Sequence, residues 1–363
     1  VEGLGGVLQS EGSVRPMPSA AMRCASMATM SVSIIVFVYE SFAYNMVFLG
    51  RLLPAVGKGA LVLPFAVLFN SVWFLAVWSY FRAYLADPGT VPGRWQDFVR
   101  QMGDALPVAP ARPEWQPGKA TYCRKCQMPR PERAKHCKVC EICVLRMDHH
   151  CPWINNCVGF YNHKFFLLLG IYSCSACLAG LGTSLSELAL CIGAVMRMED
   201  GRAFAWEEKD LETIDALVFL VFGVMALFVA VLLTPLLSTH LPLAMQNITS
   251  IEDNYENMPN PFDQGDASAN LAQIFGAFGL DWFFPVYPCK PLTDGVSFER
   301  CDDPLGQSDR SSGEEMEWNL DSLSPEQLWR RRFNVRLPNE AKVATPAEDR
   351  GPLSLLTRWW GWP

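Results

Sequence analysis

The chain has 363 residues and a formal net charge of −7; 50% of its residues are hydrophobic and only 18% are charged. Soluble globular domains carry about 25% charged residues. The acidic balance, without a basic tail, argues against nucleic-acid binding. The apolar excess lies in long runs, which favours one membrane domain with attached pieces over two or three soluble domains. The first twenty residues lack the layout of a cleavable signal peptide, so the first apolar run is expected to target the chain to a membrane.

Four apolar runs are long enough to cross a bilayer, which takes about 20 residues per helix. They extend over about 27–50, 61–85, 165–196 and 214–240. Buried helices of a large soluble protein are the alternative, but such helices rarely stay so apolar over this length. We therefore predict an all-α integral membrane protein with four transmembrane helices. Glu40 and Glu187 fall inside these runs and are expected to face the bundle interior, because a charge in lipid is costly.

The distribution of positive charge predicts the orientation. Residues 87–164 contain twelve Lys and Arg, whereas 197–213 contains three against six Asp and Glu. Positive loops stay in the cytoplasm, so the long loop and both termini are expected there. Golgi, endoplasmic reticulum and plasma membrane fit this pattern equally well. The expected order is a cytoplasmic tail at 1–26, two spans within 27–85, a cytoplasmic loop at 86–164, two spans within 165–240, a cytoplasmic segment at 241–292 and a polar, flexible tail at 293–363.

The cytoplasmic loop is dense in metal ligands. Seven of the thirteen cysteines and three of the five histidines lie between Cys123 and Cys157. Cysteines pair as Cys-x-x-Cys at 123/126, 137/140 and 140/143, and two sulfurs so spaced can reach one ion at about 2.3 Å. Two tetrahedral zinc sites would use eight of the ten ligands. The segment is poor in aliphatic residues, so metal is expected to supply its folding energy.

Spacing alone does not say which two ligands are spare. His149 and Cys151 are candidates, two positions apart, with Asp148 beside the histidine. A neighbouring imidazolium lowers the pKa of a thiol. A carboxylate can orient such an imidazole, as the third member of a catalytic triad does. The alternative is that all ten groups serve metals or packing, which would make the loop a zinc module that binds lipid or protein.

The run Asp148-His149-His150-Cys151 resembles the DHHC family of protein S-acyltransferases. The resemblance extends over the cysteine-rich segment 119–166 and its place between the second and third spans. Weaker matches follow at Asp87-Pro88-Gly89, at Thr249-Ser250-Ile251-Glu252, where serine replaces the usual second threonine, and at Asn270, whose family counterpart braces the cytoplasmic pieces. Together they cover about 27–288.

The resemblance implies roles that spacing left open. One structural Zn²⁺ would take Cys123, Cys126, His136 and Cys143, and the other Cys137, Cys140, His150 and Cys157. His149 and Cys151 would then remain for catalysis, with Asp148 orienting His149. Cys151 would accept a long-chain fatty acyl group from acyl-CoA, with palmitoyl the expected one, and pass it to membrane-proximal cysteines of protein substrates. Acyl-CoA, these proteins and membrane lipid are thus the expected partners.

Two other classes of function compete with this hypothesis. A membrane-anchored zinc module of the RING kind also holds two interleaved zinc ions, but its ligand spacing is wider. A small transporter or channel needs polar groups in its spans, and these spans have few. Either class predicts that Cys151→Ser leaves function intact. The run 271–288 is expected to lie on the membrane or against the spans, and His163 and His240 receive no role.

Overall fold

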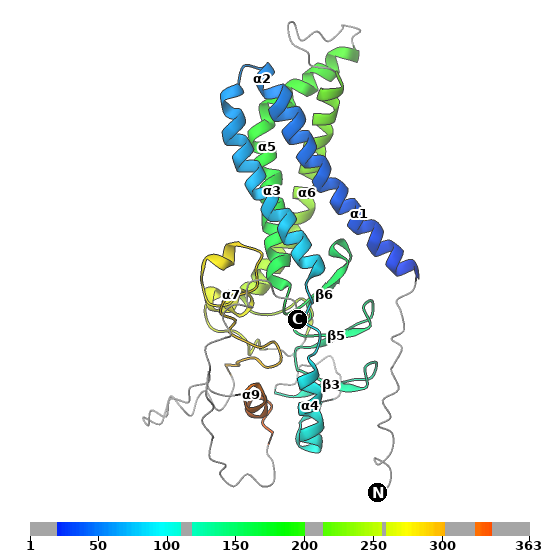
Figure 1. Cartoon of the computed structure of the whole chain (residues 1–363), viewed down its shortest axis with the longest axis vertical. Coiled ribbons are helices and arrows are strands. Elements are labelled where there is room, and N and C mark those ends of the chain that lie inside the picture. Colours follow the sequence, from blue (N-terminus) through cyan, green and yellow to red (C-terminus); the bar gives the residue numbers. More distant parts are fainter. Residues whose placement is uncertain (1–19, 110–117, 200–212, 256–258, 302–323, 336–363) are drawn as a thin grey trace, which may run out of the picture.

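The computed structural model describes residues 20–109, 118–199, 213–255, 259–301 and 324–335, with backbone only at 20–24 and 197–199. Long helices stand side by side at one end of the molecule, and short strands and helices gather at the other (Figure 1). The four long helices are α1 (Ala20–Phe42), α3 (Val62–Leu85), α5 (His163–Glu199) and α6 (Thr213–Met245). Helix α1 continues through the π-helix η1 (Ala43–Leu52) into α2 (Leu53–Ala55), and the 3₁₀ turn η2 (Gly59–Leu61) precedes α3.

Four stretches within the described residues are long and apolar enough to cross a membrane: Ala25–Ala55, Gly59–Leu85, His163–Met196 and Thr213–Met245. Large apolar side chains such as Ile35, Leu63 and Val224 are exposed on them, as lipid-facing positions would be. The predicted fold class is confirmed, and the chain is a multi-pass membrane protein. The fourth helix runs past the predicted end at His240 in spite of Pro242, because membrane helices tolerate proline where neighbouring groups compensate.

Aromatic side chains fill the middle of the bundle. The rings of Tyr44 and Phe69 stack at a centroid distance of 3.9 Å, and those of Phe48 and Phe219 at 5.1 Å. Helices α5 and α6 approach closely where Gly180 faces Phe222, since a Cβ at this glycine would lie 2.9 Å from the ring. Small residues that allow close helix contact are the usual means of packing in lipid, where the hydrophobic effect offers little.

The acidic residues of the spans are buried, as the sequence predicts. Glu40 and Glu187 are 4% and 2% exposed. The sequence indicated no partner for either acid. In the structure, Lys58 Nζ lies 2.7 Å from Glu187 Oε1, and the Cys177 thiol donates to Glu40 Oε1 at 3.9 Å. Both acids therefore serve helix packing in the described structure.

The loop between α3 and α5 begins with α4 (Gly93–Met102) and η3 (Gly103–Ala105) and then forms very short strands. The strands are β1 (Val108–Ala109), β2 (Ala120–Cys123), β3 (Met128–Arg130), β4 (Lys135–Cys137), β5 (Ile142–Val144), β6 (His149–Cys151) and β7 (Asn156–Val158), with the turn η4 (Pro152–Ile154) between the last two. They pair as one three-stranded sheet, β1-β2-β3, and two hairpins, β4-β5 and β6-β7. Sheets this small cannot bury a large core of their own.

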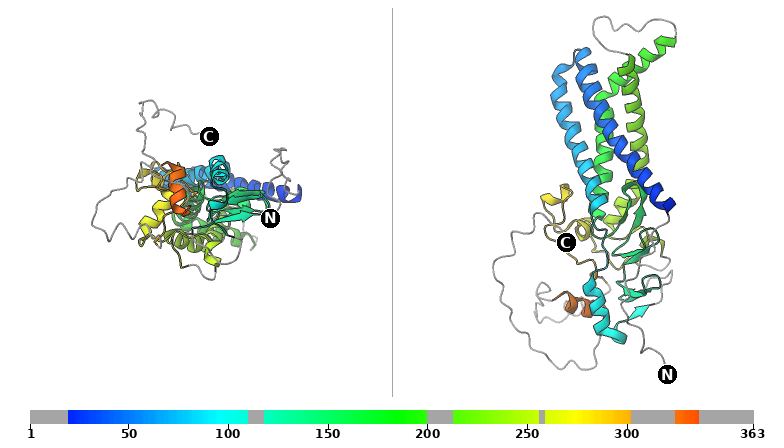
Figure 2. Two further views of the ribbon diagram at one scale, coloured as in Figure 1. Left: turned by 90° about the horizontal axis from the view of Figure 1, so that it is seen from below. Right: turned by 45° about the vertical axis from the view of Figure 1, so that its right-hand side comes forward.

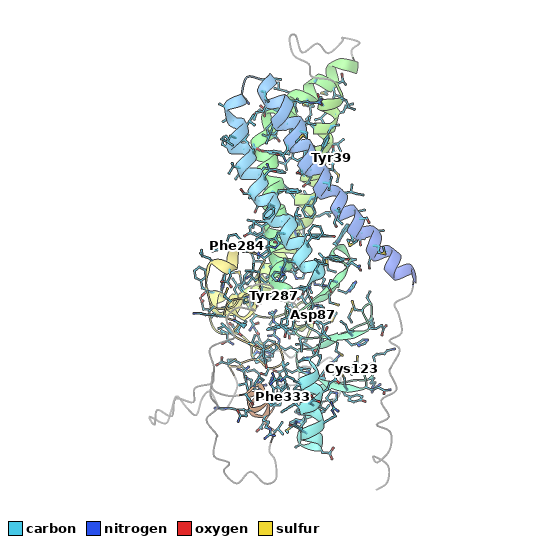
Figure 3. All side chains as sticks on the ribbon, in the orientation of Figure 1. Tyr39, Asp87, Cys123, Phe284, Tyr287 and Phe333 are labelled. Carbon is cyan, nitrogen blue, oxygen red and sulfur yellow. The ribbon has the colours of Figure 1, made fainter. Side chains whose placement is uncertain are left out.

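The joint between the bundle and the strands is built on the Asp87-Pro88-Gly89 motif (Figure 3). Asp87 Oδ1 accepts hydrogen bonds from the backbone of Gly89 and Thr90, both at 2.8 Å. The Gly89 carbonyl then accepts from Leu145 N at 2.7 Å. Gly89 has φ +115°, which favours glycine. The joint fixes the strands directly beneath α3.

The segment after α6 wraps around this joint. It contains η5 (Glu252–Asn254), α7 (Ala267–Phe275) and η6 (Leu280–Phe283). Lys164 Nζ donates to the Asp281 carbonyl at 2.6 Å, and the Tyr172 hydroxyl to that of Phe283 at 2.5 Å. The run 271–288 thus packs against α5, one of its two expected placements.

Part of the segment expected to be a flexible tail has a fixed place in the structure. Helix α9 (Pro325–Arg332) lies beside α4 in both views (Figures 1 and 2), and its Trp329 ring meets Trp95 and Phe98 at 5.7 and 5.5 Å. A Ser324 capping box begins the helix. The expected flexible tail therefore differs from the structure at 324–335, where an Arg94–Glu326 ion pair at 2.7 Å adds to the ring contacts, and at 293–301, where Val296 and Phe298 are buried. The terminal tryptophans at 359–362 lie outside the described residues.

Candidate active site and metal centres

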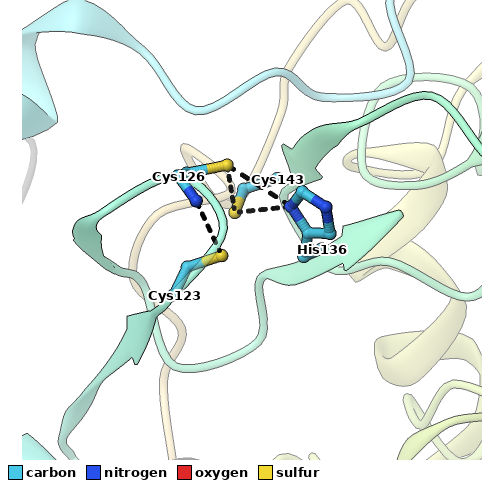
Figure 4. Close-up of side chains that lie close together, drawn as sticks. All are labelled: Cys123, Cys126, His136 and Cys143. Carbon is cyan, nitrogen blue, oxygen red and sulfur yellow. Dashed lines mark hydrogen bonds between the residues drawn. The ribbon is translucent and has the colours of Figure 1, made fainter. Parts of the chain in front are cut away.

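The first ligand cluster joins two pairs of strands. Cys123 ends β2, Cys126 follows in the turn, and His136 and Cys143 face each other in the β4-β5 register. Cys126 Sγ lies 3.3 Å from His136 Nδ1 and 3.6 Å from Cys143 Sγ (Figure 4). The Cys126 N–H donates to Cys123 Sγ at 3.4 Å. A hairpin and a Cys-x-x-Cys turn thereby bring four ligands to one point.

The second cluster repeats this construction one hairpin further along. Cys137 ends β4, Cys140 follows in the turn, and His150 and Cys157 face each other in the β6-β7 register. Cys140 Sγ lies 3.4 Å from His150 Nδ1 and 3.5 Å from Cys157 Sγ. Adjacent residues of β4, His136 and Cys137, belong to different clusters, so the two centres share a strand.

Both clusters fit Zn²⁺. In each, three thiols and one imidazole nitrogen lie within 4.8 Å of one another, and all their thiols are free of disulfides. Three cysteines and one histidine are a common ligand set of closed structural zinc sites. The structure thus brings together the two sets of four that the family resemblance implies, and leaves out His149 and Cys151.

Strand β6 separates the two adjacent histidines. Successive side chains of a strand point to opposite faces, so His149 and Cys151 share one face and His150 occupies the other. His150 therefore joins the second cluster, while its neighbours face the bundle. This alternation explains why His-His-Cys serves two different sites from three consecutive positions.

Asp148, His149 and Cys151 form a connected row. His149 Nδ1 lies 2.6 Å from Asp148 Oδ2, a carboxylate that is 1% exposed. Burial disfavours charge on the imidazole, but the bonds to Asp148 and Cys151 outweigh it and raise the pKa of His149 to about 9. Burial likewise raises the pKa of Cys151, yet its hydrogen bond to His149 lowers that pKa overall. The pair is therefore suited to hold a thiolate beside an imidazolium.

The side chains around Asp148 come from the end of α6 and the segment after it. Ser250 donates its N–H to Asp148 Oδ1 at 2.7 Å and its hydroxyl to the Asp148 carbonyl at 2.9 Å. Ser250, which stands where the family motif usually has threonine, therefore keeps the hydroxyl that makes this hydrogen bond. His240 Nδ1 lies 3.3 Å from Asp148 Oδ2. The sequence analysis assigned His240 no role; its place near the end of the fourth span, on the same side as the ligand-rich loop, was the available signal.

A buried polar network fastens this segment to the strands. Arg133 donates to both carboxylate oxygens of Glu252, at 2.7 and 2.6 Å. Burial raises the pKa of Glu252, but the Arg133 charge more than offsets it and leaves that pKa lowered. Arg146 donates to Asn247 Oδ1 at 3.1 Å and to His163 Nδ1 at 2.8 Å. Because a guanidinium can only donate, the His163 ring accepts at Nδ1 as a neutral imidazole.

Asn270 joins helix α7 to the end of α6. Its Nδ2 donates to the Met245 carbonyl at 3.0 Å and to Asp263 Oδ1 at 2.7 Å, while its Oδ1 accepts from Gln264 N at 2.9 Å. The side chain is 2% exposed. These contacts support the bracing role that the family resemblance implies for it.

The turn after Cys151 is held by two spans. Thr29 of α1 donates to the Pro152 carbonyl at 2.7 Å, and Tyr80 of α3 to the Trp153 carbonyl at 3.1 Å. Cys151 itself belongs to an apolar cluster with residues of the spans, among them Tyr80 and Phe166. The thiol therefore lies where the strand hairpin meets the lower end of the bundle.

The lowered pKa of Cys151 predicts a shifted pH profile. Its alkylation by iodoacetamide should reach half-maximal rate at a lower pH than that of a free cysteine, because the thiolate persists as pH falls. His149→Gln should move this midpoint upward, since it removes the cation that stabilises the thiolate. The measurement is the alkylation rate of Cys151 against pH, followed by peptide mass spectrometry. An unchanged midpoint in the variant would contradict the pairing.

Comparison with known proteins agrees with this geometry. The family described as DHHC palmitoyltransferase matches residues 116–257. The probable protein S-acyltransferase 12 of Arabidopsis thaliana is 31% identical over 245 residues, covering 65% of this chain and 79% of that protein. Palmitoyltransferase ZDHHC15A of Danio rerio is 30% identical over 307 residues, with coverage of 78% and 88%. Human palmitoyltransferase ZDHHC2 is 34% identical over 212 residues, with coverage of 57% and 52%.

Proposed function

Because the chain belongs to the DHHC palmitoyltransferase family and is a protein S-acyltransferase, we propose that it carries a long-chain acyl group on Cys151, and that this group is palmitoyl, as in the names of its relatives. The acyl donor is acyl-CoA, and the acceptors are cysteine thiols of proteins at the membrane. The observation that carries the assignment is that His149 and Cys151 share one face of β6 at the end of the bundle, with Asp148 bound to His149 Nδ1.

The first step forms the acyl-enzyme. The Cys151 thiolate attacks the thioester carbonyl of acyl-CoA, a new carbon–sulfur bond forms, and the bond to the CoA sulfur breaks. The His149 imidazolium gives its proton to the departing CoA thiolate. Asp148, bound at Nδ1, keeps the other nitrogen of His149 turned to the sulfur and stabilises the charged ring.

The second step transfers the acyl group to the target. His149, now neutral, takes the proton of the incoming cysteine thiol. That thiolate attacks the acyl-enzyme, and the Cys151 thiolate leaves. One thioester is exchanged for another in each step, so the reaction requires no separate energy source. The residues supply position and proton transfer.

The two clusters would each hold a Zn²⁺ whose four positions are filled by protein ligands, so the ion would contribute folding energy and leave no site for substrate. The residues around them then set the geometry. The β6-β7 hairpin keeps Cys151 and His149 on the face opposite His150. Metal binding on one face thereby fixes the reacting groups on the other.

The surroundings of Cys151 suit a lipid donor. The thiol packs among apolar side chains of the spans, and burial contributes about 0.8 kcal/mol for each CH₂ of an acyl chain. Residues 119–164 hold nine Lys and Arg against three acids, a surplus that suits the CoA phosphates and anionic lipid alike. We place this face in the cytosol, in agreement with the positive charge of the loop.

The acyl-enzyme provides the test. Purified, detergent-solubilised protein is incubated with a clickable palmitoyl-CoA analogue, beside Cys151→Ser and the matched control Cys289→Ser, an exposed cysteine. We expect a hydroxylamine-sensitive label on the wild type and the control, and none on Cys151→Ser. A folded, zinc-loaded wild type without label would sink the two-step mechanism and favour a zinc module that recruits partners.

A further inference from the structure

His240 lies beside the proposed catalytic row although it comes from a different element. It stands near the end of α6, whereas Asp148 and His149 belong to the β6 strand region. Its Nδ1 is 3.3 Å from Asp148 Oδ2, the same oxygen that His149 Nδ1 contacts at 2.6 Å. Asp148, His149 and His240 form a compact third group of polar atoms within the described residues.

Three rings pack around this point. The centroids of His149 and His240 are 5.1 Å apart with a tilt of 37°. Phe166 of α5 meets both rings edge-on, at 5.1 Å from His149 and 5.2 Å from His240. The His149 ring is therefore held on one side by an aromatic residue and on another by a second imidazole, so rotation away from Cys151 would break both contacts.

The Asp148 carboxylate is buried, and few hydrogen-bond donors lie near its two oxygens. Its side chain is 1% exposed, and a buried carboxylate requires hydrogen-bond donors or cations at its oxygens. Ser250 N serves Oδ1 at 2.7 Å. Near Oδ2 lie His149 Nδ1 at 2.6 Å and His240 Nδ1 at 3.3 Å. Among the described residues, His240 Nδ1 is a buried atom without a hydrogen bond of regular geometry, and Asp148 Oδ2 lies 3.3 Å from it.

We propose that His240 is a positioning residue for the acyl transfer: its Nδ1–H holds Asp148 Oδ2 and its ring holds His149, so that the imidazole stays directed at Cys151. The inference rests on the proposed function of that row. His240 acts through Asp148 and His149, without touching the acyl group. It also ties the reacting groups to the last turns of the fourth span, which continue from His240 to Met245.

Two substitutions separate the N–H donor of His240 from its ring. His240→Phe keeps an aromatic ring against Phe166 and His149 but removes the donor. His240→Asn lacks the ring, but its side-chain amide places an N–H where Nδ1 was. Thr239→Val is the matched control, because Thr239 is the exposed neighbour whose hydroxyl bonds only within its own helix, to Pro235 O.

The measurement is the single-turnover rate of Cys151 acylation against palmitoyl-CoA concentration, with zinc content determined for each variant. We expect His240→Phe to lower the maximal rate by about tenfold, the lower end for residues that orient a reacting group through a hydrogen bond. The half-saturating concentration and the zinc content should stay at wild-type values. His240→Asn should be faster than His240→Phe but slower than the wild type. Thr239→Val should keep the wild-type rate.

Two results would contradict a positioning role for His240. A maximal rate in His240→Phe equal to that of the wild type would overturn the positioning role. So would an equal loss in the Phe and Asn variants, because a purely structural role gives no advantage to the donor. Wild-type acylation that depends on Cys151 leaves the proposed function standing in either case, whereas absence of wild-type acylation removes the proposed function itself.

Discussion

Asp148→Asn is expected to lower the maximal rate of Cys151 acylation by roughly 10⁴-fold, the loss that follows when the carboxylate of a catalytic triad becomes an amide. The carboxylate is buried, accepts from His149 at 2.6 Å, and has its pKa lowered by His149 and His240 against the effect of burial. The amide cannot stabilise the imidazolium and allows the wrong tautomer of His149. The rate is measured with clickable palmitoyl-CoA in a single turnover.

The control for this variant is Asp253→Asn, an exposed carboxylate close in sequence to Ser250. It should keep the wild-type rate. Zinc content should be unchanged in both variants, because Asp148 is not among the eight ligands. Acylation by Asp148→Asn at nearly the wild-type rate would show that Cys151 reacts without an oriented imidazole.

Cys143→Ser is expected to release zinc from both centres, although Cys143 belongs only to the first. Strand β4 carries ligands of both clusters, and β5 pairs with it through His136 and Cys143. The ligands of the second centre, Cys137 and Cys157, pack in one small apolar cluster with Ile142 and Val144 of β5, so a disturbed β5 would loosen this centre too. Binding of one structural zinc is worth about 10–16 kcal/mol in zinc-finger peptides.

The measurement combines zinc content by mass spectrometry with thermal unfolding of the detergent-solubilised protein. Cys174→Ser is the matched control, because this half-buried cysteine lies in the third span away from both clusters; its zinc content should equal that of the wild type. Retention of one full zinc equivalent in Cys143→Ser, with acylation preserved, would show that the two centres fold independently.

The spans and the presence of a loop dense in metal ligands could be predicted from the sequence because their signals are local, whereas the division into two sets of four came from the family resemblance. Apolar runs and Cys-x-x-Cys spacing depend on residues a few positions apart, and the DHHC resemblance separated His149 from His150. Strand alternation in β6 now gives the physical reason for that separation. The role of Cys151 and the identity of the bound metal remain predictions.

The remaining partnerships join residues far apart in the chain. His240 meets Asp148 across 92 positions, and Lys58 meets Glu187 across 129. No periodicity or spacing indicates such pairs, because tertiary packing alone decides which helix ends meet. Helix α9 was missed for a related reason: its composition is polar, and Trp329 becomes informative only when Trp95 is beside it.

The alternation of side chains along β6 also determines which histidine faces which group of residues. His149 and His150 have the same side chain, and only their alternate positions along the strand turn one toward Asp148 and Cys151 and the other toward the second ligand cluster. Insertion of one residue between His149 and His150 would put both histidines on one face of the strand and Cys151 on the other, which would disable both sites at once. The four-residue run is therefore constrained in length as strictly as in composition.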